Sequence, residues 1–99
     1  MTGGQCPNVG IAGYLLGTGF NWSLSRYYGS GAENVVEVTA VLANGNLVKV
    51  NWENDLKDLM WGLMGAGGNQ LALVLDFKMK IHKTPENNYS VAFIEYFFE

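Results

Sequence analysis

The stretch "NVVEVTAVLANGNLVKV", residues 34 to 50, limits the fold more than any other part of the chain. The residues of its first half fall alternately into two sets, as in a strand with one buried face. The first set is Val36, Val38, Ala40 and Leu42, and the second is Val35, Glu37, Thr39 and Val41. Asn44-Gly45 then supplies two residues that tolerate positive φ, and a second β-branched run follows. The pattern predicts a β-hairpin, and a hairpin makes the sheet to which it belongs at least partly antiparallel.

Helical spacing predicts an amphipathic helix after the hairpin, over residues 54 to 64. Asn54 or Asp55 is expected to cap its start, and Gly65 is expected to end it. A shorter helix or turn is expected over residues 21 to 29. The face that the longer helix should bury consists of Leu56, Leu59, Met60 and Leu63.

Two more strands are expected near the C-terminal end of the chain. In residues 71 to 82 two sets of side chains alternate, and polar residues gather in one set in the second half. Residues 89 to 98 are rich in aromatic and β-branched side chains. The expected fold class is therefore α+β, an antiparallel sheet with flanking helices. One face of the strand over residues 71 to 82 should carry Leu73, Leu75, Phe77, Met79 and Ile81.

Composition excludes several classes of function. The chain has 99 residues, 48% of them hydrophobic, and a net charge of −3 without a basic run. Nucleic acids and anionic membrane surfaces both select clustered Lys and Arg, so neither is an expected partner. No apolar run approaches the ~20 residues of a membrane span, and no signal-peptide pattern is present. Met1 leads at once into glycines and Cys6, so we expect the chain to begin inside a larger fold.

The common catalytic patterns are missing. One histidine and one cysteine cannot form a His/Cys metal cluster, and His82 is interpreted as a surface residue at a strand end. The glycine-rich stretches at 3 to 20 and 65 to 70 lack the Walker and dinucleotide fingerprints. They are either tight turns or loops whose bare backbone lets a ligand approach. Cys6 is a buried small residue, a reactive thiol or an attachment point.

Three blocks in fixed order carry a family resemblance. They are "CPNVGIAGYLLGTGF", "LSRYYGSGAENVVEVTAVLANGNLV" and "NDLKDLMWGLMGAGGNQLALVLDFKMK". Together they resemble the FAD-linked oxidases with a PCMH-type FAD-binding domain, in particular the berberine bridge enzyme-like and glucooligosaccharide oxidase group. The resemblance implies that residues 1 to 85 are a partial FAD-binding domain, its second subdomain, and that residues 86 to 99 begin a substrate domain. The first FAD subdomain and most of the substrate domain would then be partners.

The resemblance also implies roles for individual residues. Cys6 matches the cysteine that forms a 6-S-cysteinyl bond to FAD in doubly attached members, and the glycines beside it would let the backbone approach the flavin. The implied cofactor-binding residues are Cys6, Pro7, Val9, Gly10, Gly13, Tyr14, Gly17, Asn34 and Val74. The chain departs from the pattern at Thr18, Met64, Ala66 and Leu71-Ala72, where the family usually has glycine, arginine, glycine and Phe-Gly.

The implied function is that of an FAD-dependent oxidoreductase, of which this chain is a part. It would oxidise a sugar or alcohol type substrate by hydride transfer to flavin, with oxygen as acceptor. Two other hypotheses stay open, a truncated or degenerate fragment without activity and a small ligand-binding or assembly module. We also expect residues 1 to 20 to be loosely held in the separate chain, because their apolar groups would normally contact the flavin and the missing subdomain.

Overall fold

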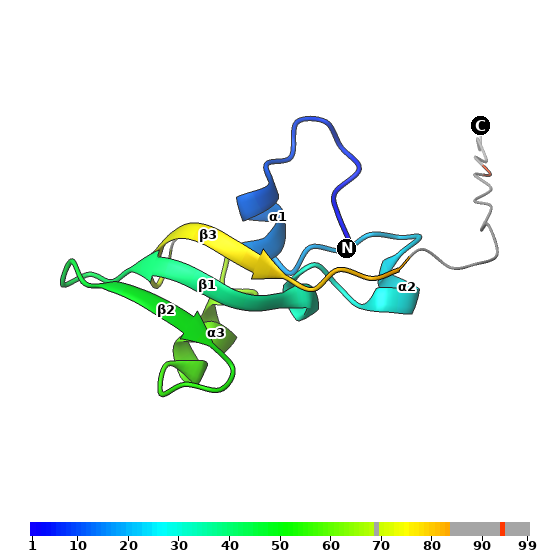
Figure 1. The fold of residues 1–99 in the computed structure, drawn as a ribbon. Helices are drawn as coiled ribbons and strands as arrows, with labels where there is room; N and C mark the ends of the chain where they lie inside the picture. The colour runs from blue at the N-terminus through cyan, green and yellow to red at the C-terminus, as the bar shows by residue number, and fades with distance from the viewer. Residues whose placement is uncertain (69, 84–93, 95–99) are drawn as a thin grey trace.

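The computed structural model describes residues 1–68, 70–83 and 94. Within these residues a three-stranded antiparallel sheet has the order β2-β1-β3, and helices flank it (Figure 1). The predicted fold class, α+β with an antiparallel sheet, is confirmed. The elements in chain order are α1 (Ile11–Leu16), α2 (Ser25–Tyr28), the 3-10 helix η1 (Ala32–Asn34), β1 (Val35–Val41), β2 (Leu47–Asn51), α3 (Lys57–Leu63) and β3 (Leu73–Met79).

The predicted hairpin is confirmed as β1 and β2. Val38 pairs with Val50, and Val41 pairs with Leu47 next to the turn. Gly45 has φ +84°, the left-handed conformation that the Asn-Gly pattern indicates, and its N–H donates to the carbonyl of Leu42 over 2.9 Å. Local residue preferences were therefore enough to identify this element.

The face that β3 buries differs from the predicted one. Thr39 pairs with Asp76 and Ala40 with Val74, so Leu75 is an extra residue, a β-bulge. An extra residue reverses the two faces of a strand beyond it. Leu73 and Leu75 are consequently exposed, whereas the partly buried side chains packed against the core are Val74, Phe77 and Met79. The strand also ends at Met79 instead of reaching residue 82.

One hydrophobic core joins the sheet to α1 and α3. Leu15 and Leu16 come from α1, and Met60 and Leu63 come from α3. All four are at most 1% exposed, so both helices are held by buried side chains. The remaining buried members of the core are Val35, Val38, Ala40, Val50 and Ala72.

Helix α3 confirms the predicted amphipathic helix but begins later than expected. Its first residue is Lys57, and no side chain caps it. The side-chain oxygen of Asn54 instead accepts the N–H of Leu56 over 3.1 Å, within the turn that precedes the helix. Leu56 and Leu59, predicted to be buried, are only partly buried and pack at the margin of the core.

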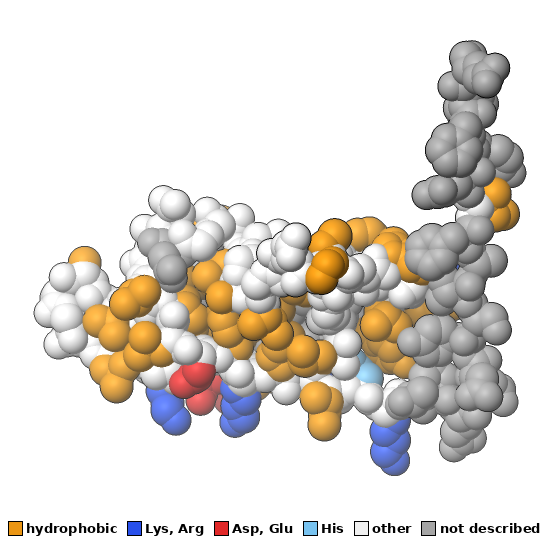
Figure 2. Space-filling view, turned by 90° about the horizontal axis from the view of Figure 1, so that it is seen from above, with side chains coloured by type: hydrophobic (Ala, Val, Ile, Leu, Met, Phe, Trp, Pro, Cys, Tyr) orange, Lys and Arg blue, Asp and Glu red, His pale blue; other side chains and the backbone are white. Residues whose placement is uncertain are grey.

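Several expectations cannot be compared with the fold. The strand over residues 89 to 98 and the proposed domain boundary at residues 85 and 86 lie outside the described residues. None of the helices that the structure describes is long and apolar enough to cross a bilayer. On one face of the molecule, hydrophobic side chains extend from the end with the β1–β2 turn towards the middle, and the visible charged side chains lie along one edge (Figure 2).

Candidate flavin-linking segment and aromatic groove

Cys6 lies on an exposed turn before α1. Its carbonyl oxygen accepts the N–H of Val9 over 3.2 Å, which closes the turn around Pro7 and Asn8. The thiol is free and exposed, so the alternative of a buried structural cysteine is wrong. Val9, whose N–H closes the turn, has an apolar side chain that is 50% exposed.

Helix α1 was not predicted, because glycines interrupt its sequence pattern. Its inner face carries Leu15 and Leu16, and an exposed stripe at helical spacing carries Gly10, Gly13 and Gly17. A methyl group added at Gly10 or Gly13 would meet no other atom within 4 Å, and neither residue has a positive φ. Neither packing nor conformation within this chain requires glycine there, so the bare backbone is available to a group that approaches from outside.

The ring of Tyr14 is the reason why other positions, near this ring, require glycine. Its ring lies so close to Gly19 and Gly31 that an added methyl group would stand 2.6 Å and 2.7 Å from the ring carbon Cε1. Gly4 lies against the same ring. The hydroxyl of Tyr14 is buried without a hydrogen-bond partner among the residues that the structure describes, and burial raises the pKa of this phenol.

Thr18 adopts a conformation that suits glycine. Its φ is +80°, and it is the only residue other than glycine with a positive φ among the described residues. The carbonyls of Thr18 and Gly19 accept the N–H groups of Ala32 and Gly31 over 2.9 Å and 2.6 Å. These two bonds join the end of α1 to the start of η1 and hold Thr18 in a strained backbone conformation.

Asn34 is buried, with 1% of its surface exposed. The amide nitrogen donates to the carbonyls of Tyr28 and Ser30 over 2.9 Å and 2.7 Å. The amide oxygen lies 2.6 Å from Nε2 of His82. His82 is partly exposed, as expected of a surface residue, but it lies beyond the end of β3 and also belongs to a polar cluster.

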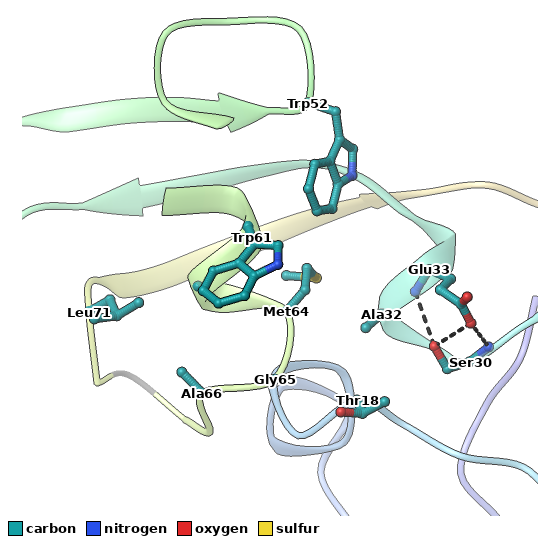
Figure 3. Close-up of a pocket in the computed structure, with 11 residues that line it drawn as sticks. Thr18, Ser30, Ala32, Glu33, Trp52, Trp61, Met64, Gly65, Ala66 and Leu71 are labelled. Carbon is teal, nitrogen blue, oxygen red and sulfur yellow. Dashed lines mark hydrogen bonds between the residues drawn. The ribbon is translucent and has the colours of Figure 1, made fainter. Parts of the chain in front are cut away.

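An open groove lies on another part of the surface, with a volume of about 780 Å³. Trp61 of α3 is 76% exposed and Trp52 is 47% exposed, and their rings stand at one side of the groove (Figure 3). Towards the other side the carboxylate of Glu33 accepts the backbone N–H and the hydroxyl of Ser30 over 2.7 Å and 2.8 Å. The bond from the Ser30 N–H is the main cause of the lowered pKa of Glu33. The other lining residues are Thr18, Ala32, Gly62, Met64, Gly65, Ala66 and Leu71.

The predicted site residues fall into three places. Most of them lie together on the turn and on α1: Cys6, Pro7, Val9, Gly10, Gly13, Tyr14 and Gly17. Asn34 lies at the end of η1, and Val74 lies half-buried in β3 opposite Ala40. The described residues contain no group of three or more His, Cys, Asp or Glu side chains that could hold a metal ion.

Comparison with known proteins decides the family. No protein-family model matches the chain. Berberine bridge enzyme-like 23 of Arabidopsis thaliana is 37% identical over 83 residues, which cover 84% of this chain and 15% of the relative. Xylooligosaccharide oxidase of Thermothelomyces thermophilus is 39% identical over 84 residues, which cover 85% and 16%. Glucooligosaccharide oxidase from Acremonium strictum, described with a 6-S-cysteinyl, 8α-N1-histidyl FAD, has a solved structure with TM-score 0.76 and 31% identity, covering 87% of this chain and 18% of the oxidase. The chain is a homologue of one segment of the FAD-linked oxidases.

The FAD-linked oxidases that it matches are much longer. The chain spans 15% of berberine bridge enzyme-like 23 and 16% of xylooligosaccharide oxidase. Of the residues at which the chain is expected to depart from the FAD-linked oxidase pattern, Thr18, Met64, Ala66 and Leu71 line the groove, whereas Ala72 is buried in the core. Sequence reasoning did not identify the groove itself. Trp61 could have been noticed, because it lies off the predicted buried face of its helix, but no local signal connects it with Trp52.

Proposed function

We propose that this chain forms the part of an FAD-dependent oxidoreductase that holds the flavin, with Cys6 as a covalent attachment point. One observation carries the proposal: an exposed thiol lies on the turn before α1, and at Gly10 and Gly13 of this helix start no contact among the described residues requires glycine. Homology with an oxidase that carries a 6-S-cysteinyl FAD supports the same assignment.

The surroundings of Cys6 suit a flat ring system. Gly10 and Gly13 leave the backbone of α1 uncovered, and the exposed side chain of Val9 offers an apolar contact. Pro7 stiffens the turn that presents the thiol. We propose that Tyr14 and Gly17 complete this surface and that Val74 contributes main-chain contacts. Asn34 contributes by positioning the residues around it, since its amide is occupied by bonds within the chain.

The proposed reaction is the oxidation of a sugar or alcohol type substrate. FAD supplies the redox chemistry, because it can take a hydride from the substrate and pass the electrons to oxygen, the acceptor that we propose. The protein contributes binding and orientation. The substrate-binding and remaining FAD-binding parts are proposed to correspond to the regions of the relatives that this chain does not span.

A chimera tests the flavin-holding role. This chain replaces the matching segment of the Acremonium strictum glucooligosaccharide oxidase, and the purified protein is examined for bound flavin. The unaltered oxidase and a chimera with Cys6→Ser serve as controls. We expect the chimera to bind FAD, and the Cys6→Ser variant to show a changed flavin spectrum because one attachment is lost. A chimera that folds but binds no FAD would contradict the proposal and favour a degenerate segment.

The substrate class needs a separate measurement, because the chimera takes its substrate-binding part from the other oxidase. An oxidase that contains this chain would be mixed without oxygen with simple alcohols, monosaccharides and oligosaccharides. Bleaching of the flavin by a sugar or alcohol is the expected result, followed by recovery of the absorbance when oxygen is admitted. Bleaching by none of these compounds would contradict the proposed substrate class.

A further inference from the structure

The side chain of Asn34 connects three segments that are distant in sequence. Its amide nitrogen bonds to the carbonyls of Tyr28 and Ser30 and lies 3.3 Å from Oγ1 of Thr2. The backbone carbonyl of Asn34 accepts the N–H of Lys80 over 2.7 Å. A buried amide with this many partners fixes the relative positions of the segments that provide them.

His82 completes this cluster from the chain beyond β3. The nitrogen of the Asn34 amide must lie where it can donate to the two carbonyl oxygens. The amide oxygen is therefore the atom that faces Nε2 of His82. Because an amide oxygen only accepts, Nε2 of His82 carries the hydrogen and donates it over 2.6 Å. The imidazole also stacks on the ring of Tyr28, with the ring centroids 4.5 Å apart.

Thr2 is the point at which the cluster meets the N-terminal segment. Its side chain is completely buried, and Oγ1 donates to the carbonyl of Gly29 over 3.0 Å. The amide of the buried Asn21 holds the next residue, because its nitrogen donates to the carbonyl of Gly3 over 2.7 Å. At the other end of the segment, Gly10 precedes α1, which Leu15 and Leu16 anchor in the core. Cys6 therefore lies on a short loop that is fixed at both ends.

We propose that His82 is a positioning residue for Cys6. It orients the amide of Asn34, which holds Thr2 and with it the start of the loop that carries the thiol. Such restriction raises the rate at which a thiol reacts with one atom of a bound ring, because misplacement by a small distance slows a reaction strongly. The importance of this position for flavin attachment rests on the proposed function, whereas the positioning of the loop does not.

Nuclear magnetic resonance relaxation of the 99-residue chain tests the positioning without any flavin. We expect His82→Leu to lower the backbone order parameters of residues 3 to 6 measurably below the wild-type values, although not into the range of flexible backbone below about 0.6, because Asn21 still holds Gly3. Thr2→Val should do the same from the other end of the cluster. His82→Gln should keep values near those of the wild type, because the glutamine amide offers an N–H close to the position of Nε2.

Comparison of the variants separates positioning from general stabilisation. The double variant Thr2→Val with His82→Leu should resemble either single variant, because both break the same connection. Order parameters in β1 and α3 should stay unchanged in all variants. The proposal is overturned if His82→Leu leaves residues 3 to 6 as ordered as in the wild type, if the two changes simply add, or if His82→Gln loosens the loop as much as His82→Leu.

Discussion

Thr18 stands where the FAD-linked oxidase pattern has glycine, and its backbone shows why glycine suits the position. A β-branched residue at φ +80° is strained by roughly 1–2 kcal/mol, and the bonds to Ala32 and Gly31 prevent relaxation. Replacement by glycine removes this strain but costs entropy when the chain folds. We predict that Thr18→Gly raises the free energy of unfolding by about 0.5–1 kcal/mol. Urea denaturation checks this, and a loss of stability would show that the Thr18 side chain makes a compensating contact.

Tyr14 has a buried hydroxyl without a hydrogen-bond partner in the described part of the chain, which is unusual in a folded protein. We predict that Tyr14→Phe keeps or increases stability at neutral pH, by up to about 1 kcal/mol, because no hydrogen bond is lost. In a flavin-bound protein the same change should weaken cofactor binding if the hydroxyl then finds its partner. Thermal unfolding of the separate chain measures the first effect, and a clear loss of stability there would contradict it.

The titration of Tyr14 gives a second, independent prediction. Burial raises the folded-state pKa above the unfolded value of 10.0, so between these two values the folded chain keeps a proton that the unfolded chain releases. This contribution is complete below pH 10.0 and is lost as the pH rises through the folded-state pKa. The wild type should therefore lose more stability than Tyr14→Phe above pH 10. If the free energy of unfolding falls with pH equally in the two proteins, the raised pKa of Tyr14 is contradicted.

At the scale of elements, α3 is held by Met60 and Leu63, and its exposed residues should matter little. We predict that Leu63→Ala lowers the free energy of unfolding by about 2–5 kcal/mol, since Leu63 is 1% exposed. Trp61→Ala on the same helix is the matched control and should cost much less, because Trp61 is largely exposed. Chemical denaturation of both variants measures the difference. Equal losses would mean that the indole has a packing role in the separate chain.

How well the sequence predicted an element depended on how local its determinants are. The hairpin and the two buried residues of α3, Met60 and Leu63, follow from residue preferences over a few positions, and both were predicted. The bulge at Leu75 depends on pairing with β1 and could not be read from the alternation in β3. Likewise, the contact between Asn34 and His82 joins residues 48 positions apart, so no local pattern could predict it. Helix α1 was missed because its glycines hide the two leucines that anchor it.

The same comparison applies to the candidate site. The residues on the turn and α1 came from a resemblance over the whole stretch, and the structure brings them together. Residues 1 to 20 were expected to be loose, but the premise that their apolar groups lack partners within the chain is wrong for Leu15 and Leu16. The groove lined by Trp52 and Trp61 depends on how α3 and the residue after β2 are placed relative to one another, which no local pattern describes.

At the scale of the whole molecule, the described residues leave many large apolar side chains uncovered. Phe20 is 74% exposed, Trp61 76% and Leu47 66%, on different elements. Such a surface is typical of a part that normally contacts other protein. We predict that the separate chain binds a hydrophobic dye and associates as its concentration rises, measured by dye fluorescence and sedimentation. A monomer at every concentration without dye binding would contradict this.

The most direct test of the account is the chemical state of Cys6 in a flavin-loaded chimera. Arg26 is the first basic residue of the chain, so trypsin releases Cys6 in a peptide that ends at Arg26. Mass spectrometry should show that peptide joined through the flavin to the peptide with the histidine of the second bond, with fragment ions that place the flavin on Cys6, and the Cys6→Ser variant should give the peptide without flavin. An unmodified peptide from a chimera that holds FAD would contradict the assignment of Cys6 as the attachment point.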